Sequence, residues 1–197
     1  MAQQYTDAMI DCETTSTRPD RGAMIQLSAV KFNLETHDVS LDMFNRCLHM
    51  PAWRSWDDST YNWWVNDKRE TLEKIMLAME EPAKVMEDFV DWAAPTGHLR
   101  FWSKPLSFDW PFVAGYCADF NQPMPFDFRQ ANDMRAFMRG KCWPEPFKEP
   151  QLTFKGIPHN ALHDVLHQIR VLFSFMEYGN GYVEQEKTDV VLQEAHS

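Results

Sequence analysis

Two carboxylates inside a short apolar segment near the start constrain this sequence more than any other feature. Residues 8–13, Ala-Met-Ile-Asp-Cys-Glu, alternate like a β-strand and are followed by turn-forming residues at 14–16. Because strand side chains alternate, Asp11 and Glu13 project from the same face, roughly 7 Å apart along the chain. Two like charges this close resist joint ionisation unless a cation or a proton lies between them. The segment therefore predicts either a metal site or an ordinary strand end whose polar residues face water.

Hydrophobic periodicity along the rest of the chain predicts an α/β fold. We expect further strands at 24–32, 43–48 and 99–102, and helices at 61–65, 71–79, 82–92, 112–120 and 160–178. Ser59 or Thr60 is expected to cap the first helix and Thr71 to start the second, whereas Pro82 opens the third. Since the first three strands follow one another closely, an antiparallel meander is the simplest arrangement.

Composition and length restrict the class of protein. The 197 residues carry a formal net charge of −10, which argues against a passive nucleic-acid binder but not against an enzyme whose carboxylates hold cations. The seven glycines form no Gly-rich phosphate loop, and the four cysteines are spread singly, as in reduced proteins. Neither a signal peptide nor a membrane span is expected. We expect a cytoplasmic protein with one domain over residues 1–182 and a polar, acidic tail over 183–197.

Further acidic residues and a histidine occur where elements are expected to begin or end. Asp109 follows the strand at 99–102 and stands between two aromatic residues, a setting that suits a metal ligand or a helix cap. Near the start of the final helix, Asp164 points away from the apolar stripe and His159 lies on the preceding loop, so both can reach a common cleft. A zinc site on the histidine row at 159, 163 and 167 is an alternative, but it leaves the other acidic residues unexplained.

These segments together resemble a known family of nucleases. Asp11-Cys12-Glu13-Thr14-Thr15, then Asp109, then His159-Asn160-Ala161-Leu162-His163-Asp164 resemble the motifs of the DEDD exonuclease superfamily, in its histidine-containing DEDDh branch. The resemblance extends from about Met9 to Met176. Ser59-Thr60-Tyr61-Asn62-Trp63-Trp64 and Asn132-Asp133-Met134-Arg135 look like segments of phage DexA-type exonucleases and small bacterial exoribonucleases. The resemblance implies a ribonuclease H-like fold, in which helices flank a mixed central sheet whose first three strands are antiparallel.

The resemblance also implies a metal-dependent 3′-5′ exonuclease that releases nucleoside 5′-monophosphates. Asp11, Glu13, Asp109 and Asp164 are the implied ligands of two divalent cations. Asp11 would bridge both ions, Glu13 and Asp164 would complete the site of the attacking water, and Asp109 would support the second ion directly or through water. His159 is the implied general base that takes a proton from that water. Carboxylate ligands without cysteine favour Mg²⁺ or Mn²⁺.

Substrate contacts are expected around the same residues. Thr14 and Thr15 are implied to meet the terminal nucleotide. Trp64 and Phe108 are candidates for stacking on bases, although aromatic residues at helical spacing more often belong to the core. The expected partner is the 3′ end of a single-stranded nucleic acid in a bacterial or phage-infected cell, and the phage-like resemblance slightly favours DNA.

Several alternatives stay open at this stage. The chain could be a 3′-5′ exoribonuclease, or a non-catalytic adaptor on the same fold that binds nucleic acid or protein. A homodimer is also left open. The segment 129–155 has six basic residues against three acidic ones, and it predicts either a phosphate-binding surface or a solvated loop.

Overall fold

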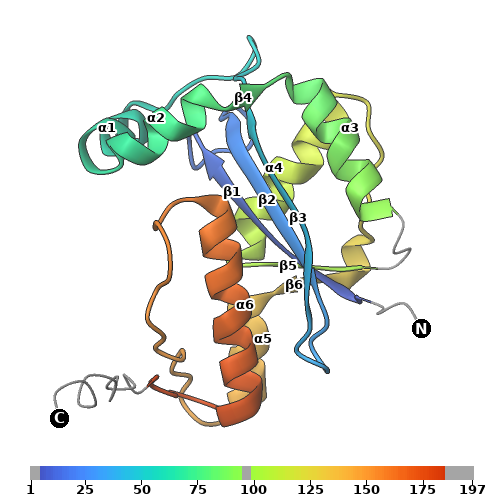
Figure 1. Ribbon diagram of the computed structural model, residues 1–197, viewed down its shortest axis with the longest axis vertical. Helices are drawn as coiled ribbons and strands as arrows, with labels where there is room; N and C mark the ends of the chain where they lie inside the picture. Colours follow the sequence, from blue (N-terminus) through green and yellow to red (C-terminus); the bar gives the residue numbers. More distant parts are fainter. Residues whose placement is uncertain (1–4, 95–98, 185–197) are drawn as a thin grey trace, which may run out of the picture.

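A six-stranded mixed sheet forms the centre of the computed structural model, which describes residues 5–94 and 99–184 (Figure 1). Its strands lie in the order β4-β3-β2-β1-β5-β6, and their bounds are β1 (Asp7–Thr14), β2 (Met24–Phe32), β3 (Val39–Leu48), β4 (Met79–Glu80), β5 (Arg100–Ser103) and β6 (Ala131–Asp133). The β1–β2 and β2–β3 pairs are antiparallel, whereas β5 is parallel to β1 and β6 is parallel to β5. The predicted α/β fold with an antiparallel first meander is confirmed.

Helices cover both faces of this sheet (Figure 1). They are α1 (Asp58–Asp67), α2 (Arg69–Leu77), α3 (Pro82–Ala93), α4 (Leu106–Asp119), α5 (Met134–Cys142), α6 (Ala161–Tyr178) and the 3₁₀ helix η2 (Phe128–Gln130). Apolar residues of α3 and α4 pack on one face, and those of α5 and α6 pack on the other. Residues of α1 and α2 form a third cluster with residues of β2 and β3.

The alternation of side chains along β1 determines which way its carboxylates point. Every second residue from Ala8 to Cys12 packs into the core cluster that contains α3 and α4. Met9 points to the opposite face and packs with α5 and α6. Asp11 and Glu13 share the face of Met9, because they follow it at intervals of two. Strand β1 therefore directs both carboxylates toward α6.

Three helices begin earlier than the sequence pattern predicts. Asp57, and not Ser59 or Thr60, caps α1, because its side chain accepts hydrogen bonds from the backbone N–H groups of both residues. Helix α2 begins at Arg69 instead of Thr71. Helix α4 begins at Leu106 and continues through Pro111, so it includes Asp109 in its first turn. The predicted opening of α3 at Pro82 is confirmed.

Some short elements have no counterpart in the predicted pattern. Strand β4 has two residues and β6 has three, and each is held by parallel pairing to a longer neighbour. Helix α5 follows β6 directly, and Asp133 caps it by accepting a hydrogen bond from the Ala136 N–H. The sequence segment 129–155, predicted as a basic surface or loop, thus contains the end of η2 and all of β6 and α5.

The end of the described chain is paired with the body of the domain. Val183 forms a β-bridge with Gln151, and the Glu184 N–H donates to the Gln151 carbonyl at 2.9 Å. These are the first two residues of the predicted tail, and the rest of that tail, 185–197, lies outside the described residues. Among the helices of residues 5–94 and 99–184, none has the length and apolar character needed to cross a membrane.

Candidate active site

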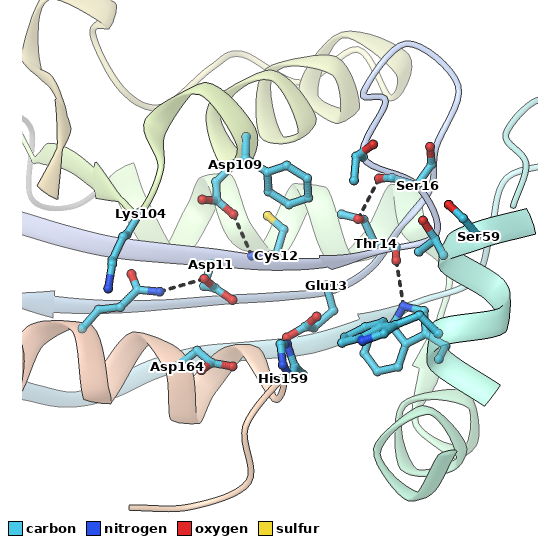
Figure 2. Close-up of a pocket in the computed structure, with 16 residues that line it drawn as sticks. Asp11, Cys12, Glu13, Thr14, Ser16, Ser59, Lys104, Asp109, His159 and Asp164 are labelled. Carbon is cyan, nitrogen blue, oxygen red and sulfur yellow. Dashed lines mark hydrogen bonds between the residues drawn. The ribbon is translucent and has the colours of Figure 1, made fainter. Parts of the chain in front are cut away.

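A cleft of about 510 Å³ lies where β1, α1, α4 and α6 meet (Figure 2). The end of β1 contributes one wall, the first turn of α4 a second, and the start of α6 with the preceding loop a third. The lining residues are Asp11, Cys12, Glu13, Thr14, Ser16, Thr17, Ser59, Thr60, Trp63, Trp64, Lys104, Phe108, Asp109, His159, Asp164 and Gln168. Segments from distant parts of the sequence, including all four acidic residues singled out above, therefore line one cavity.

Three carboxylates form a tight group in this cleft. Asp11, Glu13 and Asp164 each offer an oxygen, and these atoms all lie within 4.8 Å of one another. The group arises because β1 points Asp11 and Glu13 at α6, and Asp164 lies in the first turn of that helix, after the Asn160 cap. Figure 2 shows the three side chains turned toward one another between β1 and α6. This spacing suits a divalent cation held by several oxygen atoms.

Asp109 reaches β1 from the other side of the strand and is not part of that group (Figure 2). Its Oδ1 atom accepts a hydrogen bond from the Cys12 N–H at 3.0 Å. Pairing of β1 with β5 extends only to Met9, so β5 does not occupy this position beside Cys12. Oδ2 of Asp109 is buried and forms no hydrogen bond of normal geometry with a described residue, but the nearby Ser103 hydroxyl lowers the pKa of this carboxyl. A buried carboxylate oxygen without a partner is costly, and it marks a position where a water or a cation would be held.

Burial raises the pKa values of all four acids, and repulsion from neighbouring acids adds to this at Asp11 and Glu13. Burial raises the pKa of Glu13 to about 8, with further repulsion from Asp164 and Asp109. Burial likewise raises the pKa of Asp109 to about 7 and that of Asp164 to about 6. The pKa of Asp11 also lies well above its usual range, chiefly through burial and then through its three acidic neighbours. The site thus retains protons near neutral pH unless a cation replaces them.

Asp7, on the same strand, shows how a structural carboxylate is satisfied in this protein. It is fully buried, and it accepts hydrogen bonds from the Arg100 guanidinium at 2.7 and 2.8 Å and from the Trp102 Nε1–H at 2.6 Å. In the part of the chain that the structure describes, none of the four acids of the cleft has an Arg or Lys ion-pair partner. Lys104 lines the cleft but pairs with Glu149. The donor set therefore fits hard divalent cations such as Mg²⁺ or Mn²⁺.

His159 lies at the mouth of the cleft on the loop before α6. Its backbone has φ +63°, a left-handed conformation, and its ring packs edge-on against Trp63 with centroids 4.8 Å apart. Burial, and secondarily the positive charge of Lys68, lowers the pKa of His159 below its usual value. A neutral imidazole at neutral pH can accept a proton, as a general base must.

The three histidines of the predicted alternative zinc row do not line up. Asn160 caps α6, so His159 lies outside the helix. His163 uses its Nδ1 to accept a hydrogen bond from the Ile157 N–H, and the His167 ring packs against Phe154. Within the described residues, no histidine joins the group of potential metal ligands.

The four expected substrate residues have different surroundings. Thr14 and Phe108 line the cleft. Thr15 does not, because it is fully buried and its Oγ1 donates to the Ser55 carbonyl and accepts from the Ala23 N–H. Trp64 is only 1% exposed, and its Nε1–H donates to the Thr14 carbonyl at 3.0 Å. Thr15 thus lies outside the cleft, whereas Trp64 lines it with little exposed surface, and both side chains hold the end of β1 in place.

Gln168 and Lys104 line the cleft although the sequence did not predict them as site residues, as do the hydroxyl residues Ser16, Thr17, Ser59 and Thr60. Gln168 donates from Nε2 to Oδ1 of Asp11 at 2.9 Å, while its own Oε1 is buried without a described partner. It lies one helical turn after Asp164, a spacing that could have indicated a shared face. Lys104 follows the end of β5, and no pattern in its neighbouring residues marks it as a cleft residue.

Comparisons with solved structures place this fold among nucleases. The chain resembles exonuclease I in its apo form (TM-score 0.65, 17% identity), covering 88% of this chain and 42% of that one. It resembles cell-death related nuclease 4, CRN-4 (TM-score 0.63, 19% identity), over 92% of this chain and 68% of that one. Exonuclease I of E. coli in complex with a dT13 oligonucleotide matches with TM-score 0.62 and 14% identity, over 88% and 40% of the two chains.

The present chain thus spans less than half the length of the exonuclease I structures that it matches. No curated protein sequence matches it. At the level of families, residues 6–176 match the domain described as a 3′-5′ exoribonuclease, Rv2179c-like. This match covers most of the chain, including every acidic residue of the cleft. The chain belongs to the Rv2179c-like family of 3′-5′ exoribonuclease domains, within the DnaQ-like 3′-5′ exonucleases.

Proposed function

We propose that this protein removes nucleoside 5′-monophosphates from the 3′ end of single-stranded nucleic acid, with two divalent cations, Mg²⁺ or Mn²⁺, at the acidic cleft. The observation that carries the proposal is the group of Asp11, Glu13 and Asp164, whose oxygens lie within 4.8 Å of one another without a basic partner among the described residues. Bound divalent cations would supply an activated water and neutralise charge on the phosphate.

Each side chain has a distinct part in the proposed reaction. Asp11 and Glu13 from β1 and Asp164 from α6 would hold the cations, and the Gln168 amide orients Asp11 by a hydrogen bond to its Oδ1. Asp109 fixes the end of β1 through the Cys12 N–H, and its free oxygen contributes to the second cation site, directly or through a water. His159 accepts the proton of the attacking water, for which its lowered pKa suits it near neutral pH.

We propose RNA as the preferred substrate. The family description names an exoribonuclease and matches residues 6–176, which outweighs the slight preference for DNA expected from the phage-like segments. Several of the matched exonuclease I structures contain DNA oligonucleotides, at identities below 20%. Thr14 lines the cleft, and its hydroxyl, which donates to the Ser16 carbonyl, can still accept a hydrogen bond from a ribose 2′-hydroxyl, while Phe108 would face the base. Recognition of the 2′-hydroxyl is what separates RNA from DNA at such a site.

The proposal is tested with matched RNA and DNA oligonucleotides, labelled at one end and blocked at either end in turn. We expect Mg²⁺-dependent release of nucleoside 5′-monophosphates from free 3′ ends, faster on RNA than on DNA. Degradation from blocked 3′ ends, or products with a 3′-phosphate, would contradict the assignment. Equal rates on RNA and DNA would remove only the sugar preference.

His159→Ala tests the proposed general base. Turnover should fall about 10²- to 10⁴-fold, the usual contribution of a positioned base, while stabilisation by Mg²⁺ in a thermal melt persists. His49→Ala, at an exposed position outside the cleft, is the matched control and should keep wild-type turnover. Near-normal turnover of His159→Ala would exclude the role.

A further inference from the structure

A second pocket of about 640 Å³ lies beside the first turn of α4, at the end of β6. Trp110 of α4, Phe128 of η2, and Arg135 and Arg139 of α5 are among its lining residues. None of these residues lines the acidic cleft. The pocket includes residues of the basic segment 129–155, a segment that contributes no residue to the acidic cleft.

The two arginines of this pocket are accessible, and nearby acidic side chains neutralise little of their positive charge. Arg139 is exposed and has no ion-pair partner within the described residues, and Arg135 has only a 3.8 Å contact with Glu149. The one acidic residue in the lining, Asp133, is occupied with backbone groups. Its two oxygens accept hydrogen bonds from the N–H groups of Leu106 at 2.8 Å and Ala136 at 2.7 Å. The guanidinium groups thus remain able to bind an anion.

The apolar side of the pocket is aromatic. Phe128 is 68% exposed, and the Arg129 guanidinium lies over its ring, 4.6 Å from the centroid. Trp110 is half-buried and anchored by an edge-on contact with Phe101, with centroids 5.0 Å apart. An aromatic surface next to accessible arginines is a combination that binds the bases and phosphates of single-stranded nucleic acid.

The second pocket is adjacent to the acidic cleft along the same helix turn. Phe108 lines the cleft and Ser107, its neighbour in sequence, lines the second pocket. The two cavities therefore flank the first turn of α4, and an α-helix with its side chains is about 10–12 Å across. A strand whose 3′ end lies in the cleft could cross this turn within a few nucleotides.

We propose that the second pocket is a subsite for a nucleotide of the substrate strand, on the 5′ side of the nucleotide being removed. The base lies against Trp110 and Phe128, and the backbone phosphates meet Arg135 and Arg139. This inference rests on the proposed exonuclease function, since it requires the 3′ end to be in the acidic cleft. A subsite at this position makes the enzyme favour oligonucleotides that are long enough to fill both cavities.

The test compares two substrates of different reach. A long single-stranded oligonucleotide can occupy both cavities, whereas the p-nitrophenyl ester of a nucleoside 5′-monophosphate can occupy only the cleft. Phe128→Ala and Arg139→Glu, both at exposed positions, should each lower kcat/KM on the oligonucleotide about tenfold, mainly through KM, and leave hydrolysis of the ester unchanged. Arg139→Glu should also reduce the slope of log KM against log salt by about 0.7 for each phosphate that the variant no longer binds.

Controls separate this inference from the proposed function. Lys74→Glu on α2, a charge reversal at an exposed lysine outside both cavities, should behave as wild type on both substrates. If the wild-type protein cleaves neither substrate, the proposed function itself fails. If it cleaves both and the variants are impaired on neither or on both equally, the subsite is excluded. A wild-type dimer that Arg139→Glu converts to monomers in sedimentation would instead identify the pocket as an interface between copies of the chain.

Discussion

Replacing Glu13 with Gln should stabilise the metal-free protein at alkaline pH while abolishing its activity. Burial and repulsion raise the pKa of Glu13 from 4.5 to about 8. The folded chain therefore binds this proton more tightly than the unfolded chain, and the stability present below pH 4.5 is lost as the pH rises toward 8. Glutamine has nearly the same shape and carries no titrating proton, so the variant escapes that loss.

The size of the effect follows from the pKa. About 1.4 kcal/mol per pKa unit gives roughly 4–5 kcal/mol for the whole window from 4.5 to about 8. Water penetration and side-chain movement reduce such burial penalties in real proteins. We therefore expect the free energy of unfolding of Glu13→Gln to exceed that of wild type by about 1–3 kcal/mol at pH 8.5, and by less at pH 5.5.

Urea denaturation in EDTA at the two pH values measures this difference. Asp7→Asn is the matched control, because Asp7 is a buried carboxylate of the same strand that already has Arg100 and Trp102 as partners. That control should lose about 2–4 kcal/mol, since it leaves charged and polar partners unpaired. When Mg²⁺ is added, wild type should gain stability by ligand linkage, and Glu13→Gln should gain much less. A variant that is less stable than wild type at pH 8.5 without metal would refute the reasoning.

Three further measurements test the cleft. Mg²⁺ affinity, measured by calorimetry, should rise between pH 6 and pH 8.5, because the cations displace protons from the acids of the cleft. Asp164 and Glu13, for example, have pKa values of about 6 and 8. An affinity that does not change with pH would contradict this protonation. Gln168→Leu removes the hydrogen bond to Asp11, and we expect Mg²⁺ affinity or turnover to fall about 10- to 100-fold, with Gln122→Leu outside the cleft as control. Trp64→Phe keeps the aromatic packing but removes the donor to the Thr14 carbonyl, so the free energy of unfolding, measured by urea denaturation, should fall by about 1–3 kcal/mol. An unchanged free energy of unfolding would mean that this hydrogen bond does not hold the end of β1.

Local periodicity predicted which way three of the acids point, and the resemblance to the DEDDh motifs predicted that they belong to one site. The direction of Asp11 and Glu13 depends only on the alternation of a strand, and that of Asp164 only on its position relative to the apolar stripe of α6. Both are properties of a few neighbouring residues. The fold adds that these two elements face each other across the sheet surface, which brings three acids within 4.8 Å.

The residues predicted less well depend on contacts between distant segments. Thr15 follows the same strand as Thr14, yet its hydroxyl is taken up by Ser55 and Ala23, and nothing in the local sequence shows this. The early start of α4 was missed because a proline such as Pro111 usually marks a helix boundary. Strand β6, with three residues, exists only through its pairing with β5. The second pocket, built from 106–111 and 128–139, follows from that pairing.

The two cavities differ in charge, and they therefore contribute differently to binding of the substrate strand. The cleft gathers four acids, so it repels a phosphate until cations occupy it. The second pocket presents Arg135 and Arg139, which attract phosphate whether or not metal is present. In the proposed function, metal therefore controls whether the 3′ end enters the cleft, while the arginines hold the strand beside it. The net charge of −10 is therefore compatible with a polyanionic substrate, because cations would neutralise the four acids of the cleft and two arginines line the pocket beside it.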